Sequence, residues 1–381
     1  MCHYDGVALD WSRERTKERE MHTVIAGGGL VGLTTAAALR RIGHDVTVLE
    51  QAPEIRAAGA GIGLWANAVR VLDDVGVDVR ALGQEITAWF FDPAGKPLRA
   101  NGYDDSDHRF LLVPRPALNT VLADAVGRDR IRLSARLTGF EDHADEVVVH
   151  LDGGESLRAD LLIGADGVHS RVRARLLPGS DAQEHAGHYA WRAIVPAGDE
   201  RPEGTVLTIG TAGTRGGYTR VAEGRTMWMV NQFETGPLPG TRRDRALARA
   251  RNLADAGRHD ELLRMIAATP EDTILENRIM LVPPLPHWTG SRVALIGDAA
   301  HGLSPHIAAG GTLGVEDVGV LRTALATSDP TGALKRYEDS RRARFERVRE
   351  FSAAVEKAVG PADFAERYAA FSHWMLTTAP G

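Results

Sequence analysis

Short apolar runs that end at a glycine or an acid are the main pattern in the first half of the chain. Residues 23–26 and 46–49 are β-branched runs that flank an alanine- and leucine-rich stretch ending at Arg41. This order predicts a strand, a helix and a second strand. Two more apolar runs, at 160–163 and 292–296, each lead into a glycine–aspartate corner. Strands and helices that alternate in this way indicate an α/β fold.

The pattern changes near Tyr189. The runs 189–195, 206–209 and 226–230 are rich in aromatic and β-branched residues and are separated by glycine-rich turns. Such runs predict an antiparallel sheet. We further expect helices at 68–77, 115–126, 242–268 and 341–358, and strands at 131–137 and 147–151.

These elements predict a Rossmann-like domain of the α/β class, an interleaved antiparallel-sheet domain and a C-terminal helix. Residues 1–20 hold an alternating charge run and no apolar core for a signal peptide, so we expect a disordered extension. The expected boundaries are 21–180 with 275–330 for the Rossmann-like domain, 181–274 for the second domain, to which part of 80–115 contributes, and 331–381 for the C-terminal helical segment.

The composition is that of an ordinary globular chain. Its 381 residues are 43% hydrophobic and 25% charged, enough for one extended or two packed domains. A net charge of −6 leaves no basic surface for nucleic acid, and no apolar run approaches the roughly 18 residues that span a membrane. Cys2 is the only cysteine, which excludes an internal disulfide and a cysteine-built metal site. We therefore expect a cytoplasmic protein without a metal, nucleic-acid or membrane partner.

A glycine-rich turn, G-x-G-x-x-G, joins the first strand to its helix. Gly27 allows the tight turn, Gly29 lets a pyrophosphate approach the backbone, and Gly32 lets the helix pack closely on the strand. The free N–H groups at the start of the helix favour phosphates. Glu50 ends the second strand, where a carboxylate accepts hydrogen bonds from a ribose and repels a 2'-phosphate. The sequence therefore predicts a dinucleotide site that disfavours NADP.

This fingerprint does not distinguish FAD from NAD, and two other corners bear on the choice. Asp298 follows the strand at 292–296, where it suits a ribityl or ribose hydroxyl. The pair Gly310–Gly311 opens a helix whose amides suit a ring oxygen or an anion. A third strand closes on a similar corner at Asp166.

Taken together, these segments resemble the class A flavoprotein monooxygenases, the para-hydroxybenzoate hydroxylase family of FAD-dependent aromatic hydroxylases. The resemblance runs from about Met21 to about Phe351. It implies that the glycine turn holds the ADP half of FAD, that Asp166 lies by the pyrophosphate and that Asp298 holds the ribityl chain. The FAD-binding residues that the resemblance implies are Gly27, Gly29, Leu30, Val31, Gly32, Glu50, Arg56, Gly61, Arg115, Leu137, Asp166, Asp298, Pro305, Gly310, Gly311 and Thr312.

One segment departs from the family pattern. Where the family usually has Ser-Pro-x-x-Gly-Gln-Gly-x-Asn, residues 304–312 read SPHIAAGGT. Ala308 stands at a position where glycine would leave the φ angle free. Asp298 and the amides of Gly310 and Gly311 remain, so FAD is still expected to bind.

The resemblance also implies a reaction. NADH or NADPH reduces the flavin, O2 adds at its C4a atom, and the hydroperoxide hydroxylates an aromatic or polycyclic small molecule, while the protein positions the ring and excludes water. An aromatic sheet with an arginine or a histidine suits a phenolate or a carboxylate. The expected protein is a monomer or a homodimer. Its candidate residues are Arg215, Tyr218, His306 and Pro305 for catalysis, and Arg192, Trp228 and Gln232 for the substrate.

Two other functions remain open. A non-oxygenating flavoprotein dehydrogenase is compatible with the altered segment at 304–312. A flavin-dependent halogenase needs a lysine near the start of its flavin half and a Trp-x-Trp-x-Ile-Pro segment. Here no lysine lies between Lys17 and Lys96, and residues 191–196 match that segment only in half.

Overall fold

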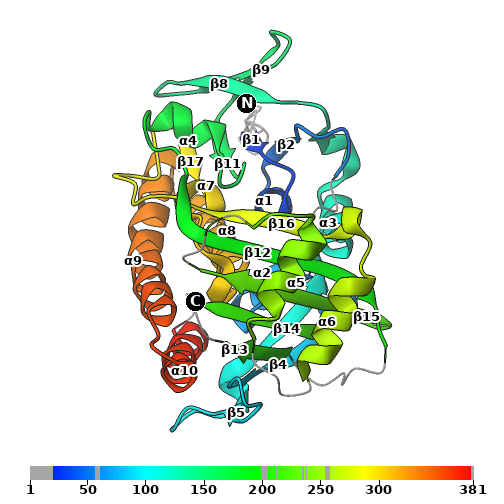
Figure 1. Ribbon diagram of the computed structural model, residues 1–381. Helices are drawn as coiled ribbons and strands as arrows, with labels where there is room; N and C mark the ends of the chain where they lie inside the picture. Colours follow the sequence, from blue (N-terminus) through cyan, green and yellow to red (C-terminus); the bar gives the residue numbers. More distant parts are fainter. Residues whose placement is uncertain are drawn as a thin grey trace, which may run out of the picture.

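The protein forms a parallel sheet, a small antiparallel sheet, a large mixed sheet and covering helices (Figure 1). This arrangement confirms the predicted α/β class. Arg56 and nearly all of the extension predicted at 1–20 lie outside the described residues. The structure is a computed structural model that describes residues 20–55, 61–198, 205–210, 213–233, 236, 238–253 and 258–378.

The parallel sheet has the strand order β17-β11-β1-β2-β7. Its central strands are almost fully buried because helices or other segments cover both faces, which explains their continuous apolar runs. The strand–helix–strand unit that the sequence predicts is thus confirmed. The strands are β1 (His22–Ala26), β2 (Asp45–Leu49), β7 (Ile131–Arg132), β11 (Leu161–Gly164) and β17 (Val293–Leu295).

A three-stranded antiparallel sheet lies beside this domain. The strand predicted at 131–137 is in fact divided between the two sheets, because Ser134 has a φ of 53° that turns the chain. The amide of Ser134 donates to the carbonyl of Ala52, which holds the turn against the parallel sheet. The small sheet contains β8 (Leu137–Asp142), β9 (Val147–Leu151) and β10 (Ser156–Ala159).

The large sheet has nine strands in the described part of the chain, with the order β16-β12-β15-β14-β13-β4-β6-β3 and β5 paired to β4. Most neighbours are antiparallel, as predicted for this region. The expected boundary at residue 275 falls too early, because β16 pairs with β12. The strands are β3 (Gly61–Leu64), β4 (Gln84–Phe91), β5 (Pro97–Leu98), β6 (Arg109–Pro114), β12 (Gln183–Pro196), β13 (Thr205–Ile209), β14 (Thr214–Ala222), β15 (Arg225–Gln232) and β16 (Leu275–Leu281).

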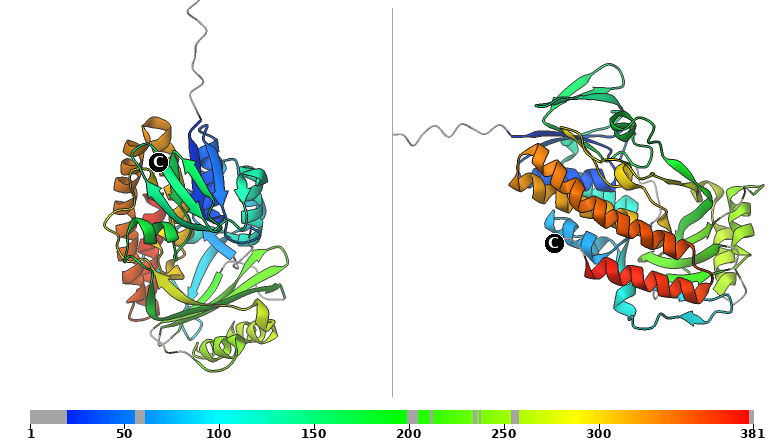
Figure 2. Two further views of the ribbon diagram at one scale, coloured as in Figure 1. Left: turned by 90° about the horizontal axis from the view of Figure 1, so that it is seen from above. Right: turned by 90° about the vertical axis from the view of Figure 1, so that its left-hand side faces the viewer.

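Two helices run along the chain's C-terminal end, where the sequence predicted one. A glycine and a proline at 360–361 separate them, and the helices pack side by side (Figure 2). The helix predicted at 242–268 is likewise two helices. The helices are α1 (Leu30–Arg40), α2 (Ala66–Asp74), α3 (Arg115–Val126), α4 (Arg171–Leu176), α5 (Arg242–Ala250), α6 (Arg258–Ala268), α7 (Asp298–His301), α8 (Gly310–Thr327), α9 (Pro330–Glu356) and α10 (Pro361–Thr377), with short 3-10 turns at η1 (Arg80–Leu82), η2 (Asp105–His108), η3 (Arg128–Arg130), η4 (Glu271–Thr273) and η5 (Pro305–Ile307).

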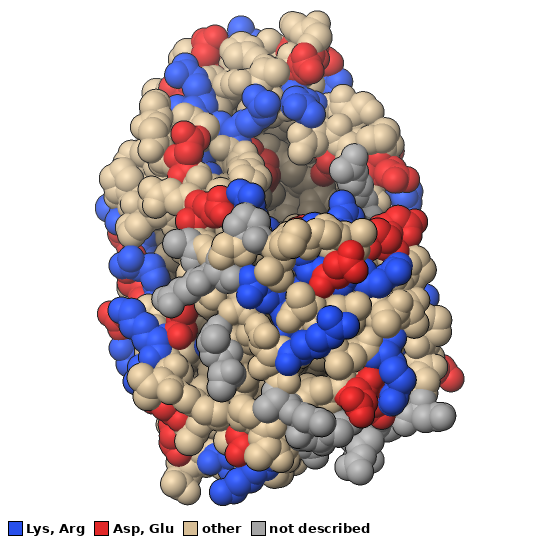
Figure 3. Space-filling view, viewed as in Figure 1, with Lys and Arg blue, Asp and Glu red and all other residues tan. Residues whose placement is uncertain are grey.

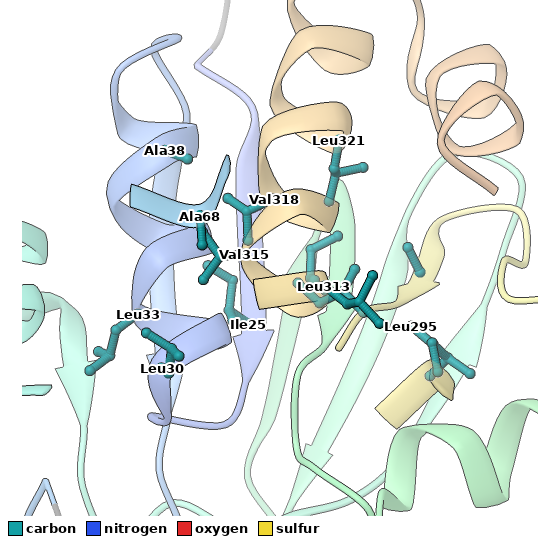
Figure 4. Close-up of a cluster of buried hydrophobic side chains, with 14 of the residues drawn as sticks. Ile25, Leu30, Leu33, Ala38, Ala68, Leu295, Leu313, Val315, Val318 and Leu321 are labelled. Atoms are coloured by element: carbon teal, nitrogen blue, oxygen red, sulfur yellow. The ribbon is translucent and has the colours of Figure 1, made fainter. Parts of the chain in front are cut away.

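The main core lies where α1 and α8 meet over the parallel sheet. Figure 4 shows side chains from β1, α1, α2, α8 and β17 packed together, Ile25, Leu33 and Leu313 among them. All three are fully buried. Because this core joins segments nearly 300 residues apart, it brings the glycine turn and the start of α8 to one edge of the sheet. In the described residues, no helix has the length and apolar character that a bilayer span requires.

Candidate active site

The glycine turn is shaped by close backbone approaches. Gly27 has a φ of 108°, and a side chain there would collide with the carbonyl oxygen of Ala165. A side chain at Gly32 would collide with the carbonyl of Gly27, which explains how α1 sits so near to β1. Gly29 differs, because a Cβ atom there would meet nothing within 4 Å. The space over Gly29 is therefore open to a ligand at the N-terminus of α1.

Glu50 lies at the end of β2 with both carboxylate oxygens held by the backbone. One oxygen accepts from the amide of Gly28 at 2.9 Å and the other from the amide of Ala52 at 2.7 Å. These bonds fix the carboxylate beside the glycine turn, and each oxygen keeps a second lone pair for a hydroxyl. A cavity of about 280 Å³ lies here, and its lining includes Gly27, Gly29, Glu50, Leu137 and Asp166.

Asp166 lines the same cavity from the end of β11, but its carboxylate is engaged locally. It accepts from the Ser170 hydroxyl at 2.5 Å and from the amides of Arg171 at 2.7 Å and Val172 at 3.2 Å. Burial raises the pKa of Asp166, although these hydrogen bonds oppose the rise. The side chain thus orders the start of α4, and it borders the cavity as part of a rigid corner.

The second aspartate corner has a different environment. Gly297 has a φ of 58°, and its neighbour Asp298 is exposed, with its side chain on the wall of a second cavity. Gly310 begins α8 so close to this carboxylate that a Cβ atom there would lie 3.7 Å from Asp298 Oδ1. The start of an 18-residue helix and an open carboxylate therefore lie next to each other.

A buried ion-pair network fixes the backbone of the Gly297–Asp298 corner. Asp317 accepts from the amide of Gly297 at 2.9 Å, from His301 at 2.6 Å and from Arg341 Nε at 2.6 Å. Arg341 also reaches Glu316 at 2.9 Å. Burial alone would raise the pKa of Asp317, but the attraction of His301 and Arg341 outweighs it and lowers that pKa. The network ties α9 to the Gly297–Asp298 corner.

The second cavity, with a volume of about 590 Å³, lies between this corner and the large sheet. Both cavities are lined by His169, so they adjoin at that residue. The space-filling view shows a hollow in the upper half of one face, over the region of α1 (Figure 3). The lining of the second cavity includes Arg115, Asp298, Pro305, Gly310 and Gly311, together with residues of the large sheet and α10.

The alternation of side chains along the strands decides which predicted residues reach this cavity. Arg192 and Arg215 line it, whereas Tyr218, Trp228 and Gln232 do not. On the helix-covered face of the sheet, the Tyr218 hydroxyl donates to Glu261 of α6, and Trp228 Nε1 donates to Thr269 Oγ1 at 2.9 Å. Gln232 shares the face of Trp228 and accepts from Thr214. Tyr218 and Trp228 therefore connect the sheet to the α6 region, and Gln232 connects β15 to β14, while none of the three lines the cavity.

Sequence reasoning missed the residues on the opposite face. The period of two along β15 places Met227, Met229 and Asn231 on the cavity wall, one position away from each predicted residue. Thr219, Asn277 and Tyr368 also line it. The alternation of side chains at 225–232 indicates a strand with two different faces. Only the packing of α5 and α6 against the sheet shows which of these faces the helices cover.

Arg215 brings a desolvated cation to the wall of this cavity. Its side chain is 6% exposed, lies over the rings of Phe233 and Phe364 at 4.7 and 4.5 Å, and donates from Nη2 to the Val355 carbonyl at 3.3 Å. The buried Nη1 has no hydrogen-bond partner among the described residues. Burial lowers the pKa of Arg215 to about 10, while Glu356 opposes the shift, so the group remains a cation at neutral pH.

His306 lines the cavity, but its ring nitrogens are both engaged. Nε2 faces the Ser352 carbonyl at 3.0 Å and must donate, so Nδ1 of the neutral ring accepts from the Ser304 hydroxyl at 2.7 Å. That oxygen in turn accepts from His188 Nδ1 at 3.1 Å. Burial, and then the charge of Arg215, hold the pKa of His306 well below its ordinary value. These bonds leave no lone pair for proton abstraction, which argues against His306 as a catalytic base.

The altered loop keeps a left-handed turn although it lacks the usual glycine. Ala308 has a φ of 53°, and its carbonyl accepts from Trp65 Nε1 at 3.2 Å. Thr312 is buried, and its hydroxyl accepts from the amide of Trp65 at 3.1 Å, so that side chain supports the loop from behind. Pro305 is exposed on the cavity wall.

The two cavities fit an elongated dinucleotide such as FAD. The open space at Gly29 and the start of α1 suit a pyrophosphate, Glu50 suits the ribose, and Asp298 with the start of α8 suits the ribityl chain and the ring. Leu30 and Val31 open α1, and Gly61 and Arg115 border the second cavity. The described residues contain no cluster of three or more His, Cys, Asp or Glu side chains that could hold a metal ion.

Comparison with known proteins places this architecture in a family. The family model of the FAD binding domain matches residues 20–352. The chain is 33% identical over 339 residues to the aurachin C monooxygenase/isomerase of Stigmatella aurantiaca, with 87% of this chain and 86% of that protein covered. It is 32% identical over 344 residues to the FAD-dependent urate hydroxylase of Klebsiella pneumoniae, with 84% and 86% covered.

A solved structure agrees with these relatives. The crystal structure of Klebsiella pneumoniae HpxO with FAD and uric acid superposes with a TM-score of 0.79 at 26% identity, covering 92% of each chain. The chain therefore shares its overall fold with that protein. The chain belongs to the FAD binding domain family and, within it, to the class A flavoprotein monooxygenases, which are FAD-dependent oxidoreductases.

Proposed function

We propose that this protein hydroxylates an aromatic or heteroaromatic molecule that carries an anionic group, with NADH or NADPH as the electron donor. The observation that carries the proposal is a cavity that is lined both by the candidate FAD-site residues and by the desolvated cation of Arg215. FAD, when bound, supplies the redox chemistry that activates O2. The urate hydroxylase relative is consistent with a small ring as the substrate.

The chain's own residues contribute binding and exclusion of water. Phe90, Phe110, Leu207, Met227 and Met229 give the cavity apolar walls that suit a flat ring. Arg215 lines the cavity as a buried cation whose Nη1 has no partner among the described residues, and a charge-assisted hydrogen bond from its guanidinium to an anion would be strong in this low-dielectric site. An aromatic acid anchored there would share the cavity with Asp298 and Pro305. The proposed catalytic work of the protein is therefore orientation and shielding.

Oxygen consumption during NADH or NADPH oxidation tests this proposal. The FAD-loaded protein is expected to consume more O2 with an aromatic acid than with its neutral analogue, and mass spectrometry should show one added oxygen atom. Arg215→Met should keep FAD but raise the KM for the acid about tenfold to a hundredfold. Reduction of the flavin without any O2 consumption or hydroxylated product would instead indicate a dehydrogenase.

A further inference from the structure

The last helix of the chain completes the wall of the substrate cavity. Tyr368 of α10 lines the cavity, and Phe364 of the same helix lies under the guanidinium of Arg215. The family match ends at residue 352, before α10 begins. Figure 1 shows α10 beside β4 and β13 of the large sheet. The family match therefore does not cover the residues that α10 contributes to the cavity wall.

The ring of Tyr368 is held on several sides. It packs at 4.8 Å from Phe90 and 5.7 Å from Phe364, measured between ring centroids, and at 5.9 Å from Phe371. The side chain is only 4% exposed. Because an aromatic side chain has two rotatable angles and the neighbours restrict both, the position of the hydroxyl is set before any ligand enters.

The hydroxyl of Tyr368 makes no hydrogen bond with a described residue, although the ring is buried. Tyr337, another buried tyrosine, behaves differently, because its hydroxyl donates to the Leu295 carbonyl at 2.8 Å. Burial raises the pKa of Tyr368, so its O–H remains a donor throughout the working pH range. The hydroxyl oxygen is accessible from the cavity, so an acceptor on an occupant of the cavity could receive its hydrogen bond.

Arg215 also lines this cavity, and its buried Nη1 has no hydrogen-bond partner among the described residues. Both side chains pack on the ring of Phe364, so the two donors belong to one region of the wall. A cation and a neutral O–H together complement an acceptor group with negative charge. An aromatic carboxylate has two acceptor oxygens and meets this requirement.

We propose that Tyr368 is a substrate-binding residue that determines specificity, donating its O–H to an oxygen of an aromatic carboxylate that pairs with Arg215. The inference rests on the proposed function, since it takes this cavity to be the substrate site. It adds a residue from α10 and names the chemical class of the substrate as an aromatic acid.

Titration of the FAD-loaded protein with benzoate tests the inference through the change in flavin absorbance. Tyr368→Phe removes only the hydroxyl, and we expect the Kd for benzoate to rise about tenfold to a hundredfold. The Kd for toluene, which has no acceptor, should change less than twofold. The melting temperature of the ligand-free variant should change little, because the hydroxyl makes no hydrogen bond with a described residue that the substitution could remove. Tyr103→Phe, at a tyrosine outside the cavity lining, is the matched control and should change neither Kd.

Several results would overturn this inference. They are an unchanged Kd for benzoate, an equal weakening of benzoate and toluene, a melting temperature lowered by several degrees, or a wild-type holoprotein that does not respond to benzoate. Failure of the proposed function gives a different result, in which benzoate binds through Tyr368 but no aromatic acid stimulates O2 consumption.

Discussion

Gly29 and Gly32 belong to the same turn, but they require glycine for different reasons. At Gly32 a side chain would collide with the backbone of Gly27, so the fold itself excludes larger residues. At Gly29 the space is empty and the backbone is extended, with a φ of −84°. The fold therefore tolerates a side chain at Gly29, and only a bound pyrophosphate would exclude it.

Gly29→Val tests this distinction. We expect a folded protein with an unfolding free energy within about 1 kcal/mol of the wild type, since nothing would clash. FAD binding should weaken at least about tenfold because the isopropyl group would occupy the pyrophosphate space. Flavin absorbance after gel filtration and a denaturant titration measure the two effects. Gly139→Val in β8 is the matched control, because it also has open space and lies away from both cavities, and it should retain FAD.

Ala308 shows strain at the site where the family usually has glycine. An L-residue in the left-handed region costs roughly 1–2 kcal/mol, whereas glycine loses roughly 0.4–1 kcal/mol through its freer unfolded state. Ala308→Gly should therefore raise the unfolding free energy by up to about 1 kcal/mol, which urea denaturation can measure. Ser134 has the same φ of 53° away from both cavities, and Ser134→Gly should give a similar gain. A clear loss of stability in Ala308→Gly would contradict the expected strain.

At the scale of elements, α9 stabilises the Gly297–Asp298 corner. Its Arg341 is 1% exposed and joins Glu316 and Asp317 of α8, and Asp317 in turn holds the amide of Gly297. Removing one partner of a buried ion pair leaves the opposite charges desolvated and uncompensated. The position of Asp298 thus depends on a helix that contributes no residue to the lining of either cavity.

Arg341→Met should lower the unfolding free energy by about 3–5 kcal/mol. The expected measurement is urea denaturation followed by circular dichroism, with FAD affinity recorded at the same time. Arg349 lies on the same helix and pairs with Glu346 at the surface, where both side chains are about half exposed. Arg349→Met should therefore change stability by less than about 1 kcal/mol. If the two substitutions lowered the unfolding free energy by similar amounts, the buried ion pairs of Arg341 would not be what stabilises the corner.

At the scale of the whole molecule, buried histidines link stability to pH. His188 is 1% exposed, and burial lowers its pKa to about 3, with the charges of His185 and Arg215 acting in the same direction. The unfolded chain binds a proton near the ordinary value of 6.5, whereas the folded chain does not. The stability contributed by the neutral ring is therefore complete above about pH 6.5 and is lost as the pH falls toward 3.

Between pH 6 and 4.5, the unfolding free energy of the wild type should therefore fall by about 1.4 kcal/mol per pH unit for each buried histidine that stays neutral in the folded protein. His188→Asn should reduce this slope by about that amount, as measured by urea denaturation at several pH values. His287 is exposed and its ring contacts the Thr289 carbonyl, so His287→Asn should leave the slope unchanged. A slope that is equal in wild type and His188→Asn would contradict a neutral, buried His188.

The strand register explains why the substrate residues were harder to predict than the FAD residues. Trp228 and Gln232 are aromatic or polar residues on a strand, as substrate residues often are, but they share a face with the contacts to α6 and its neighbours. Met229 and Asn231, one position along, face the cavity. A shift of one residue changes the face of the sheet, and local sequence does not say which face the helices cover.

The local chemistry of the sequence by itself determined the glycine turn, the acid at Glu50, the aspartate corner at Asp298 and the α/β class. Each depends on backbone conformation or on residues close together along the chain, so a short pattern carries the information. Only the tertiary structure decided that β16 joins the large sheet, that Tyr218 and Trp228 face helices, and that α10 brings Tyr368 to the cavity. Those placements depend on packing between distant segments, where many sequence patterns are compatible with either face.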